Sequence, residues 1–276
     1  MNPVLRELIT TRTMLGEDGG RIPIDSQITE EEGRHIQRVI AAIKPKTTLE
    51  VGMAYGVSTL FICEALVGAG GAKHLVIDPY QNDVPDPSRK NGERPADQGW
   101  SGMGLLNVRR AGYERLVEFH GTPSYAALPQ ILATGQKIDF ALIDGMHTFD
   151  YALVDFFFID LLLNIGGVVT FDDLSFPSIR KLCRYILTNR TYTLYQPDAS
   201  PARERPSFKR RLFERMLELP VAGRNLRRWC KPELLIPDRR LGLPDNDFVS
   251  FQKTAEDTIM AEASARYRRW DTHHPF

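Results

Sequence analysis

Between residues 47 and 197, short β-rich runs alternate with segments of helical pattern, and this alternation constrains the fold more than any other feature. Such an order is typical of β-α-β units, in which parallel strands form one sheet that helices cover on both faces. Six of the runs indicate strands in this region, and a seventh follows late in the chain. The strands are expected at Thr47–Met53, Lys73–Asp78, Val117–Gly121, Ile138–Asp144, Gly166–Asp173, Thr191–Tyr195 and Phe248–Lys253. We therefore predict one α/β domain.

Helical segments connect most of these strands, and one more helix precedes the first strand. The connecting helices are expected at Ser58–Leu66, Ser124–Ala133, Thr148–Asn164 and Pro177–Asn189. The earlier helix is expected at Glu30–Ile43, with Thr29 as its N-cap and Pro45 beyond its end. The chain then divides into a helical extension (1–46), a core (47–197), an insertion (198–247), and a last strand with its tail (248–276).

Composition limits the partners and the compartment. Lys plus Arg and Asp plus Glu each number 35, so the formal net charge is zero and gives no support for nucleic-acid binding. The three cysteines, Cys63, Cys183 and Cys230, are widely spaced, which favours a reducing compartment over a disulfide framework. The N-terminus lacks the apolar core of a signal peptide, and no run approaches the ~20 apolar residues of a membrane span. We expect a cytoplasmic protein without a membrane partner.

Two segments interrupt the alternation. Residues 81–100 are rich in Pro, Asp, Asn and Gly and predict a long loop, and such loops often act as lids. The insertion is locally basic, with twelve Lys/Arg against five Asp/Glu from Arg203 to Arg240. Its arginines would suit an acidic or phosphorylated acceptor, or would simply face water. The helical pattern at Phe208–Leu219 makes a homodimer contact another reading.

A glycine-containing turn follows the first strand, in the text Glu50-Val51-Gly52-Met53-Ala54-Tyr55-Gly56-Val57-Ser58. Glycines let the backbone turn sharply and let a cofactor lie against it. The spacing is G-x-x-x-G, which differs from the G-x-G-x-x-G of dinucleotide enzymes. The next strands end in Asp78, suited to the two hydroxyls of a ribose, and in Gly121-Thr122-Pro123-Ser124, suited to an adenine border or to an ordinary helix cap.

The most informative stretches are Ile143-Asp144-Gly145-Met146-His147-Thr148-Phe149-Asp150 and Gly166-Gly167-Val168-Val169-Thr170-Phe171-Asp172-Asp173. Both strands end in carboxylates, and the carboxyl ends of neighbouring parallel strands meet at one edge, where such folds bind ligands. Asp144, Asp172 and Asp173 would repel one another there unless a hard divalent cation lay among them. His147 follows close behind as a candidate base. The alternative is that these residues cap helices or face water.

Taken together, these residues resemble the class I S-adenosylmethionine-dependent methyltransferases. The matching text is LEVGMAYGVST at Leu49–Thr59, IDGMHTF at Ile143–Phe149 with Asp155 further on, and GGVVTFDD at Gly166–Asp173. The D-G-x-H motif is similar to that of a branch with small-molecule and sugar O-methyltransferases and cephalosporin-hydroxylase-like proteins. The resemblance covers roughly residues 25–197. It implies a Rossmann-like, seven-stranded, mostly parallel sheet with an antiparallel last strand and an insertion before it.

The resemblance also implies roles for single residues. Glu50, Gly52, Met53 and Gly56 would line the methionine end of the cofactor, and Ser58 would begin the helix beneath it. Asp78 would hold the ribose, and Gly121 to Ser124 would border the adenine. Asp144 would also contact the cofactor. At the metal, Asp144, Asp172 and Asp173 match the Mg²⁺ ligands of catechol-type O-methyltransferases. His147 falls where those enzymes keep a lysine base. The second metal-binding pair is Asp-Asn in those enzymes and Asp-Asp here.

These implications form one hypothesis, an S-adenosylmethionine-dependent O-methyltransferase acting on a small-molecule hydroxyl. A divalent cation, expected to be Mg²⁺, would lower the pKa of the hydroxyl, and His147 would take its proton before in-line attack on the methyl group. Loop 81–100 and the insertion would cover the acceptor, with Tyr80 and Trp100 as an aromatic wall. Three alternatives remain open: a metal-independent methyltransferase, an NAD(P)-dependent oxidoreductase, and a non-catalytic cofactor-binding scaffold.

Overall fold

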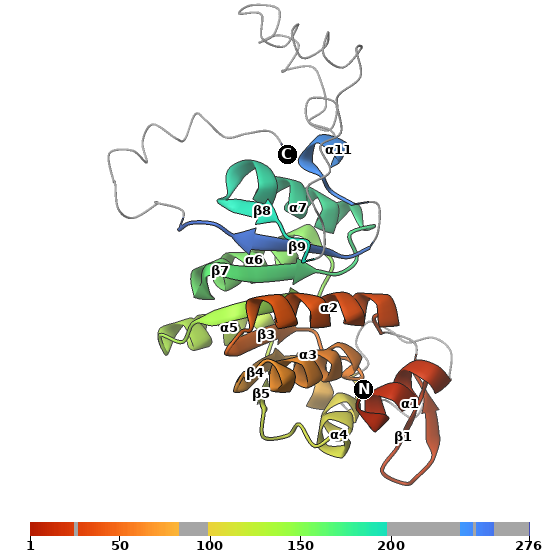
Figure 1. Cartoon of the computed structure of the whole chain (residues 1–276). Helices are drawn as coiled ribbons and strands as arrows, with labels where there is room; N and C mark the ends of the chain where they lie inside the picture. The colour runs from red at the N-terminus through yellow and green to blue at the C-terminus, as the bar shows by residue number, and fades with distance from the viewer. Residues whose placement is uncertain (25–26, 83–98, 198–237, 245–246, 257–275) are drawn as a thin grey trace, which may run out of the picture.

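A seven-stranded sheet forms the centre of the computed structural model, which describes residues 1–24, 27–82, 99–197, 238–244, 247–256 and 276 (Figure 1). The strand order is β5-β4-β3-β6-β7-β9-β8, and β9 alone runs antiparallel to its neighbours. The strands are β3 (Thr47–Val51), β4 (Lys73–Ile77), β5 (Val117–His120), β6 (Ile138–Ile143), β7 (Leu163–Phe171), β8 (Tyr192–Leu194) and β9 (Val249–Lys253). The predicted mostly parallel, Rossmann-like sheet is therefore confirmed.

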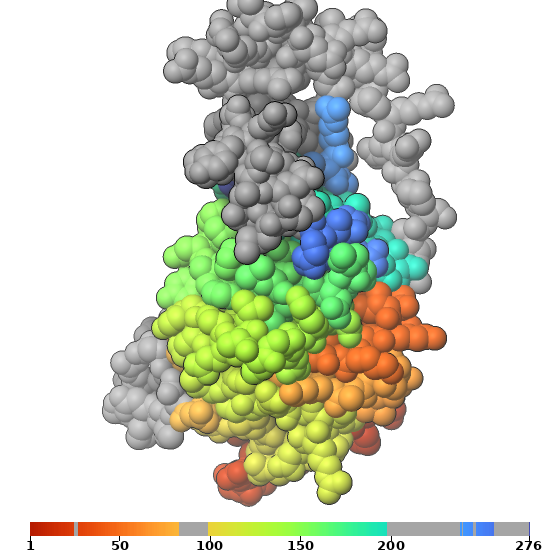
Figure 2. All heavy atoms as spheres, turned by 90° about the vertical axis from the view of Figure 1, so that its left-hand side faces the viewer, coloured from red at the N-terminus to blue at the C-terminus, as the bar shows by residue number. Residues whose placement is uncertain are grey.

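Helices cover both faces of this sheet, because alternate residues of each strand are apolar on both sides. One face packs against α5 (Ser124–Ala133), α6 (Phe149–Leu162) and α7 (Pro177–Asn189). The other packs against α2 (Glu30–Ile43), α3 (Val57–Gly68) and α4 (Met103–Arg110). Figure 1 shows α2 and α3 in front of the sheet and α6 behind it. In Figure 2 the left-hand side of Figure 1 faces the viewer, and the middle of the chain, in yellow-green and green, lies across its centre.

The N-terminal extension contains more structure than the sequence predicted. The capping box at the start of α2 is present, with the Thr29 side chain accepting from Glu32 N and the Glu32 side chain accepting from Thr29 N. Before it, α1 (Pro3–Thr11) leads into a small antiparallel hairpin of β1 (Thr13–Leu15) and β2 (Arg21–Pro23). Leu5, Leu8 and Met14 are fully or almost fully buried, so this extension is part of the core on the α2 and α3 side.

Several element boundaries differ from the predicted ones for a common reason. The acidic and glycine residues that were assigned to strand ends lie in loops, so that β3 ends at Val51 and β6 at Ile143. At the other end, β7 begins three residues early because α6 stops at Leu162 and the chain extends at once. A short 3-10 helix (η1, Pro79–Asn82), the helix α4 and the short α11 (Asp238–Leu241) were not predicted.

Parts of two predicted segments lie outside the described residues. These are 83–98 of the loop at 81–100, and 198–237 and 245–246 of the insertion, which include Phe208–Leu219 and Cys230. Their predicted roles as covers or as a dimer contact stay predictions. Cys63 and Cys183 are free and buried. Among the helices that the structure describes, none has the length and apolar character that crossing a bilayer requires.

A buried ionic group joins β9 and β8 to the end of α6. Lys253 is 1% exposed, and its Nζ donates to the Asp160 and Leu163 carbonyls at 2.8 and 3.2 Å. The Asp160 carboxylate lies 3.6 Å from the same nitrogen, pairs with Arg190, and accepts the Tyr192 hydroxyl hydrogen bond at 2.6 Å. A charge buried in this way is stable only while its partners remain.

Replacing Asp160 with alanine is expected to lower the free energy of unfolding by about 3–5 kcal/mol, because Lys253 would stay buried with less compensation. Glu256 also pairs with Lys253, at 2.8 Å, but is 58% exposed. Glu256→Ala should therefore cost less than ~1 kcal/mol. Urea denaturation of the two variants measures the difference, and similar losses would contradict the role given to Asp160.

Candidate functional site

The ends of β3 and β6 touch through main chain alone, and this contact requires a glycine. Gly52 has φ +91°, and a Cβ added to it would lie 2.0 Å from the Asp144 carbonyl oxygen. Gly56, at φ +81°, then turns the chain into α3, whose first turn contains the nearly buried Ser58. Here the connections leave β3 for β4 on one side of the sheet and lead to β6 on the other, which is where open α/β sheets bind ligands.

The predicted ribose ligand, Asp78, is 3% exposed and holds this turn in place. Its Oδ2 accepts from the backbone nitrogens of Met53 and Ala54, at 3.1 and 3.0 Å, and from Gln81 Nε2 at 3.1 Å. Its Oδ1 accepts from Tyr80 N at 2.8 Å. The carboxylate therefore fixes the glycine turn to the end of β4, and a contact to ribose stays a prediction.

The carboxylate of Glu50 lies within the sheet layer, on the side of α3. The residue is fully buried, and its Oε2 accepts from Thr59 Oγ1 at 2.6 Å and lies 3.2 Å from His74 Nε2. The other His74 nitrogen lies 2.9 Å from Thr48 Oγ1. Glu50 Oε1 has no hydrogen-bond partner within the described ranges. The Glu50 carboxylate thus links β3 to α3 and β4, and its predicted contact with the methionine end of a cofactor stays untested.

Asp155, which sequence reasoning quoted without giving it a role, connects the predicted adenine border with the loop after β6. It is 1% exposed on α6, and burial raises its pKa to about 6 although a hydrogen bond with Ser124 lowers it. A Cβ on Gly145 would lie 3.8 Å from its Oδ2. The predicted Gly121 lies at the start of the same turn as Ser124, where a Cβ would meet Asn82 Nδ2 at 2.6 Å.

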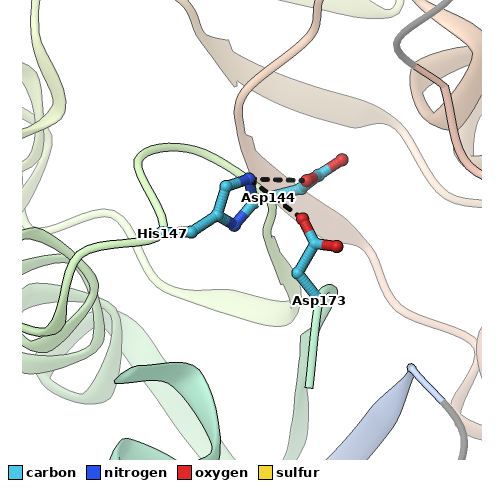
Figure 3. A group of neighbouring side chains, drawn as sticks. All are labelled: Asp144, His147 and Asp173. Atoms are coloured by element: carbon cyan, nitrogen blue, oxygen red, sulfur yellow. Dashed lines mark ion pairs between the residues drawn. The ribbon is translucent and has the colours of Figure 1, made fainter. Parts of the chain in front are cut away.

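Three side chains from two strand ends gather at the carboxyl edge of the sheet (Figure 3). His147 Nε2 lies 3.1 Å from Asp173 Oδ2 and 3.9 Å from Asp144 Oδ1. One donor atom from each residue lies within 4.8 Å of the others. The His147 ring stacks on Phe176 with centroids 5.5 Å apart, and its carbonyl accepts a hydrogen bond from the Ser178 hydroxyl. Each of the three side chains is between 23% and 32% exposed, so a ligand can reach them.

The carboxylates at this edge hold their protons more strongly than usual. Burial, followed by the charges of Asp172, Glu50 and Asp173, raises the pKa of Asp144 well above its usual range. Burial raises the pKa of Asp172 to about 7 and also raises that of Asp173, which His147 lowers in part. Such a group favours a bound proton or a cation.

The structure separates one member of the predicted metal set from the rest. Asp144 and Asp173 belong to the three-residue cluster, and the third member is His147, whereas Asp172 lies outside it. Asp172 Oδ1 accepts from the Asp173 backbone nitrogen at 2.9 Å. Asp173 itself has φ +57°, a left-handed conformation that Asp tolerates better than most residues. Asp172 therefore shapes the turn that presents Asp173.

Sequence reasoning missed two further acids near the cluster. Glu32, at the start of α2, contributes to the raised pKa values of Asp144, Asp172 and Asp173, and Asp247 contributes to those of the last two. Asp247 Oδ1 accepts from Ser175 N at 2.7 Å. The sequence predicted a helix that begins at Glu30, but only the fold brings that helix end to the edge of the sheet.

The two residues that were expected to form an aromatic wall differ in their surroundings. Tyr80 is 38% exposed, and its carbonyl accepts from Trp100 N at 2.7 Å. Trp100 packs edge-on against the buried Tyr55, with centroids 5.2 Å apart. Trp100 is therefore part of the packing beside the glycine turn, and contact of either ring with an acceptor stays a prediction.

Comparison with known proteins identifies this arrangement. Residues 49–174, from β3 to the turn after β7, match the family model described as a methyltransferase domain. This part of the chain therefore resembles a methyltransferase domain. The match contains the glycine turn, Asp78 and the Asp144–His147–Asp173 cluster. It does not distinguish the D-G-x-H branch, which stays a prediction.

Solved structures share the fold. One is the O-methyltransferase from Bacillus cereus in complex with SAH, with a TM-score of 0.51 and 16% identity, covering 71% of this chain and 83% of that one. Another is the O-methyltransferase TomG from Streptomyces achromogenes, involved in tomaymycin synthesis and solved with SAM, with a TM-score of 0.50 and 16% identity over 92% and 91% of the two chains. The search of curated proteins found no match.

The contact between β3 and β6 leads to a stability prediction with an internal control. Gly52→Ala is expected to lower the free energy of unfolding by roughly 2–5 kcal/mol, since it adds left-handed strain and an overlap with Asp144. Gly135 has φ +76° but open space around its missing Cβ, so Gly135→Ala should cost only about 1–2 kcal/mol. Chemical denaturation of both variants checks this. Equal losses would show that the backbone contact has no special cost.

Proposed function

We propose that this chain is a class I S-adenosylmethionine-dependent methyltransferase that transfers the methyl group of S-adenosylmethionine to a hydroxyl of a small-molecule acceptor, with a divalent cation held by Asp144 and Asp173 and with His147 as the general base. The observation that carries the proposal is the gathering of two carboxylates and an imidazole beside the glycine turn, where the strand order of the sheet reverses. The O-methyltransferase names of the two structural neighbours agree with a hydroxyl acceptor.

The residues of the glycine turn fit a nucleoside cofactor. Gly52 and Gly56 leave the main chain bare where β3 ends and α3 begins, so a ligand can approach the backbone closely. Asp78 keeps the turn rigid through Met53 and Ala54. We propose that the cofactor lies across this turn, with its adenine towards Gly121 and Ser124.

The cluster fits a divalent cation by the chemistry of its donors. Asp144 and Asp173 offer carboxylate oxygens, the ligands that Mg²⁺ and Mn²⁺ prefer. His147 lies beside both acids, and in this proposal its imidazole does not bind the cation and can therefore accept a proton. Burial, together with neighbouring acids, raises the pKa of both carboxyl groups, so that their ionised forms lack full compensation within the described part of the chain. A bound cation would supply that balance and would lower the pKa of a coordinated hydroxyl.

The remaining chemistry belongs to the protein. His147 stands at the mouth of the cluster, where Asp173 and the Phe176 ring fix its orientation. We propose that it takes the proton of the acceptor hydroxyl as the oxygen attacks. Asp144 lies next to Gly52, and we propose that it positions the acceptor oxygen close to the methyl carbon of S-adenosylmethionine, in near-attack geometry. Asp172 positions Asp173 through its backbone.

A metal-independent reaction is the second candidate, and one contact favours it. The 3.1 Å distance between His147 Nε2 and Asp173 Oδ2 is that of an oriented acid–imidazole pair. In that arrangement Asp173 would hold Nε2–H, and the opposite nitrogen, Nδ1, would accept the proton. Turnover that survives complete removal of divalent ions would select this candidate over the first. A cytoplasmic location remains part of the proposal in either form.

The metal assignment predicts a graded response to three matched substitutions. Asp144→Asn and Asp173→Asn are each expected to weaken Mn²⁺ binding at least about tenfold, because each removes a charged ligand. Asp172→Asn should weaken it less, since Asp172 lies outside the cluster. Calorimetric titration of Mn²⁺ into EDTA-treated protein measures all three. If Asp172→Asn has the largest effect, the predicted Asp144–Asp172–Asp173 set is the better one. If the wild type binds no divalent ion, the metal assignment is wrong.

The base assignment predicts a separation of turnover from cofactor binding. His147→Ala should lower kcat by about 10²–10⁴ at saturating divalent ion, while the affinity for S-adenosylhomocysteine changes less than about threefold. The pH–rate profile should also change. A variant with an unchanged pH–rate profile would show that another group accepts the proton. Wild-type cofactor affinity without turnover on any acceptor would instead indicate the non-catalytic scaffold.

A further inference from the structure

The outer side of α6 is apolar where a surface helix is normally charged. Its exposed residues include Tyr151, Val154, Phe157 and Leu161, which are 42%, 37%, 51% and 41% exposed. They follow one another at three or four residues and so lie along one side of the helix. Asp150, at the beginning of α6, is the only charged residue on that side. A helix that is apolar all round is normally covered on all sides.

The apolar surface continues beyond the helix at both ends. Tyr125 of α5, 54% exposed, packs edge-on against Tyr151 with centroids 6.3 Å apart. Ile165, just after α6, is 59% exposed. The helices α5 and α7 flank α6 on the same face of the sheet. The exposed apolar side chains therefore extend beyond α6 itself, and large exposed apolar surfaces mark interaction sites. We call this surface the α6 strip, comprising Tyr125, Tyr151, Val154, Phe157, Leu161 and Ile165.

Opposite charges stand at the two ends of the strip. Asp150 is fully exposed in the first turn, and a hydrogen bond with Thr148 lowers its pKa, so that it is ionised at neutral pH. At the other end, exposed Lys137 donates to the Leu161 carbonyl at 2.8 Å. A second copy of the strip laid antiparallel on the first would bring each Asp150 next to the partner's end of α6 that carries Lys137. The charge pattern is complementary to itself under twofold symmetry.

We propose that the α6 strip is a homodimer interface, in which α6 packs antiparallel against α6 of a second copy. A twofold axis makes both subunits use the same surface, as an isologous interface requires. The apolar residues form its centre, and the Asp150–Lys137 pairs form its rim and fix the antiparallel direction. Nothing in this assembly depends on the residues of the methyl-transfer site.

The first test introduces a charge into the centre of the strip. The wild-type protein is expected to sediment as a dimer, and Phe157→Glu or Leu161→Glu should raise the dimer dissociation constant at least about 100-fold. Val67, on α3 at the opposite face of the sheet, is 54% exposed and serves as a matched control. Val67→Glu should leave the dimer intact. Thermal unfolding confirms that each variant is folded, so that a lost dimer is not mistaken for a lost fold.

The second test uses the charges at the rim. Asp150→Lys and Lys137→Glu should each weaken the dimer several-fold, and the double variant should restore it, because the pairs then reform with exchanged signs. Both charges also suit the ends of α6, because Asp150 lies in its first turn and Lys137 donates to the Leu161 carbonyl near its end. A role confined to α6 would make the double variant the worst of the three. Analytical ultracentrifugation gives all four dissociation constants.

Three results would overturn the proposal. The first is a wild-type protein that stays monomeric at a concentration of about 100 μM. The second is a Phe157→Glu variant that dimerises as well as Val67→Glu. The third is a double charge variant whose dimer affinity does not recover. A monomer that co-sediments with phosphatidylglycerol vesicles, and loses this with Leu161→Glu, would assign the strip to a lipid surface instead.

Discussion

The close approach of the main chain at Gly52 to that at Asp144 is the constraint on which the site depends. The chain after β3 can approach the Asp144 carbonyl this closely only because Gly52 has no Cβ. The contact places the glycine turn beside Asp144, the first carboxylate of the cluster, although the two lie far apart in the sequence. Asp78 then secures the turn from the neighbouring strand, so that the cradle is rigid before any ligand arrives.

Electrostatics makes the carboxyl edge of the sheet unusual. The pKa values of Asp144, Asp172 and Asp173 are all raised there. Burial is the largest cause, Glu32 contributes to all three shifts and Asp247 to the last two, and His147 offsets the shift of Asp173 in part. Proteins normally pair or disperse such charges, because like charges in a partly buried place cost stability. A concentration of this kind is therefore typical of a functional edge. The buried Lys253–Asp160 group shows the contrasting case, in which the charges are paired and serve the fold.

Much of the fold was readable from the sequence, because the alternation of strands and helices is strong and Thr29 marks a helix start. The members of the cluster were not fully readable. Asp172 and Asp173 are adjacent and look equivalent in the sequence, and only the left-handed backbone of Asp173 decides which of them meets His147. The sequence did not reveal that the Glu50 side chain lies on the α3 side of the sheet, where it accepts a hydrogen bond from Thr59. The three-residue strands of the first hairpin were too short to show any periodicity.

The left-handed backbone at Asp173 has a consequence for how such a site can change. Asp, Asn and Gly are the residues that accept this conformation at small cost, so an exchange among them alters the charge of the cluster without rebuilding the turn. A single base change converts Asp to Asn or to Gly. The net charge of the cluster can therefore change during evolution while the backbone around it stays the same.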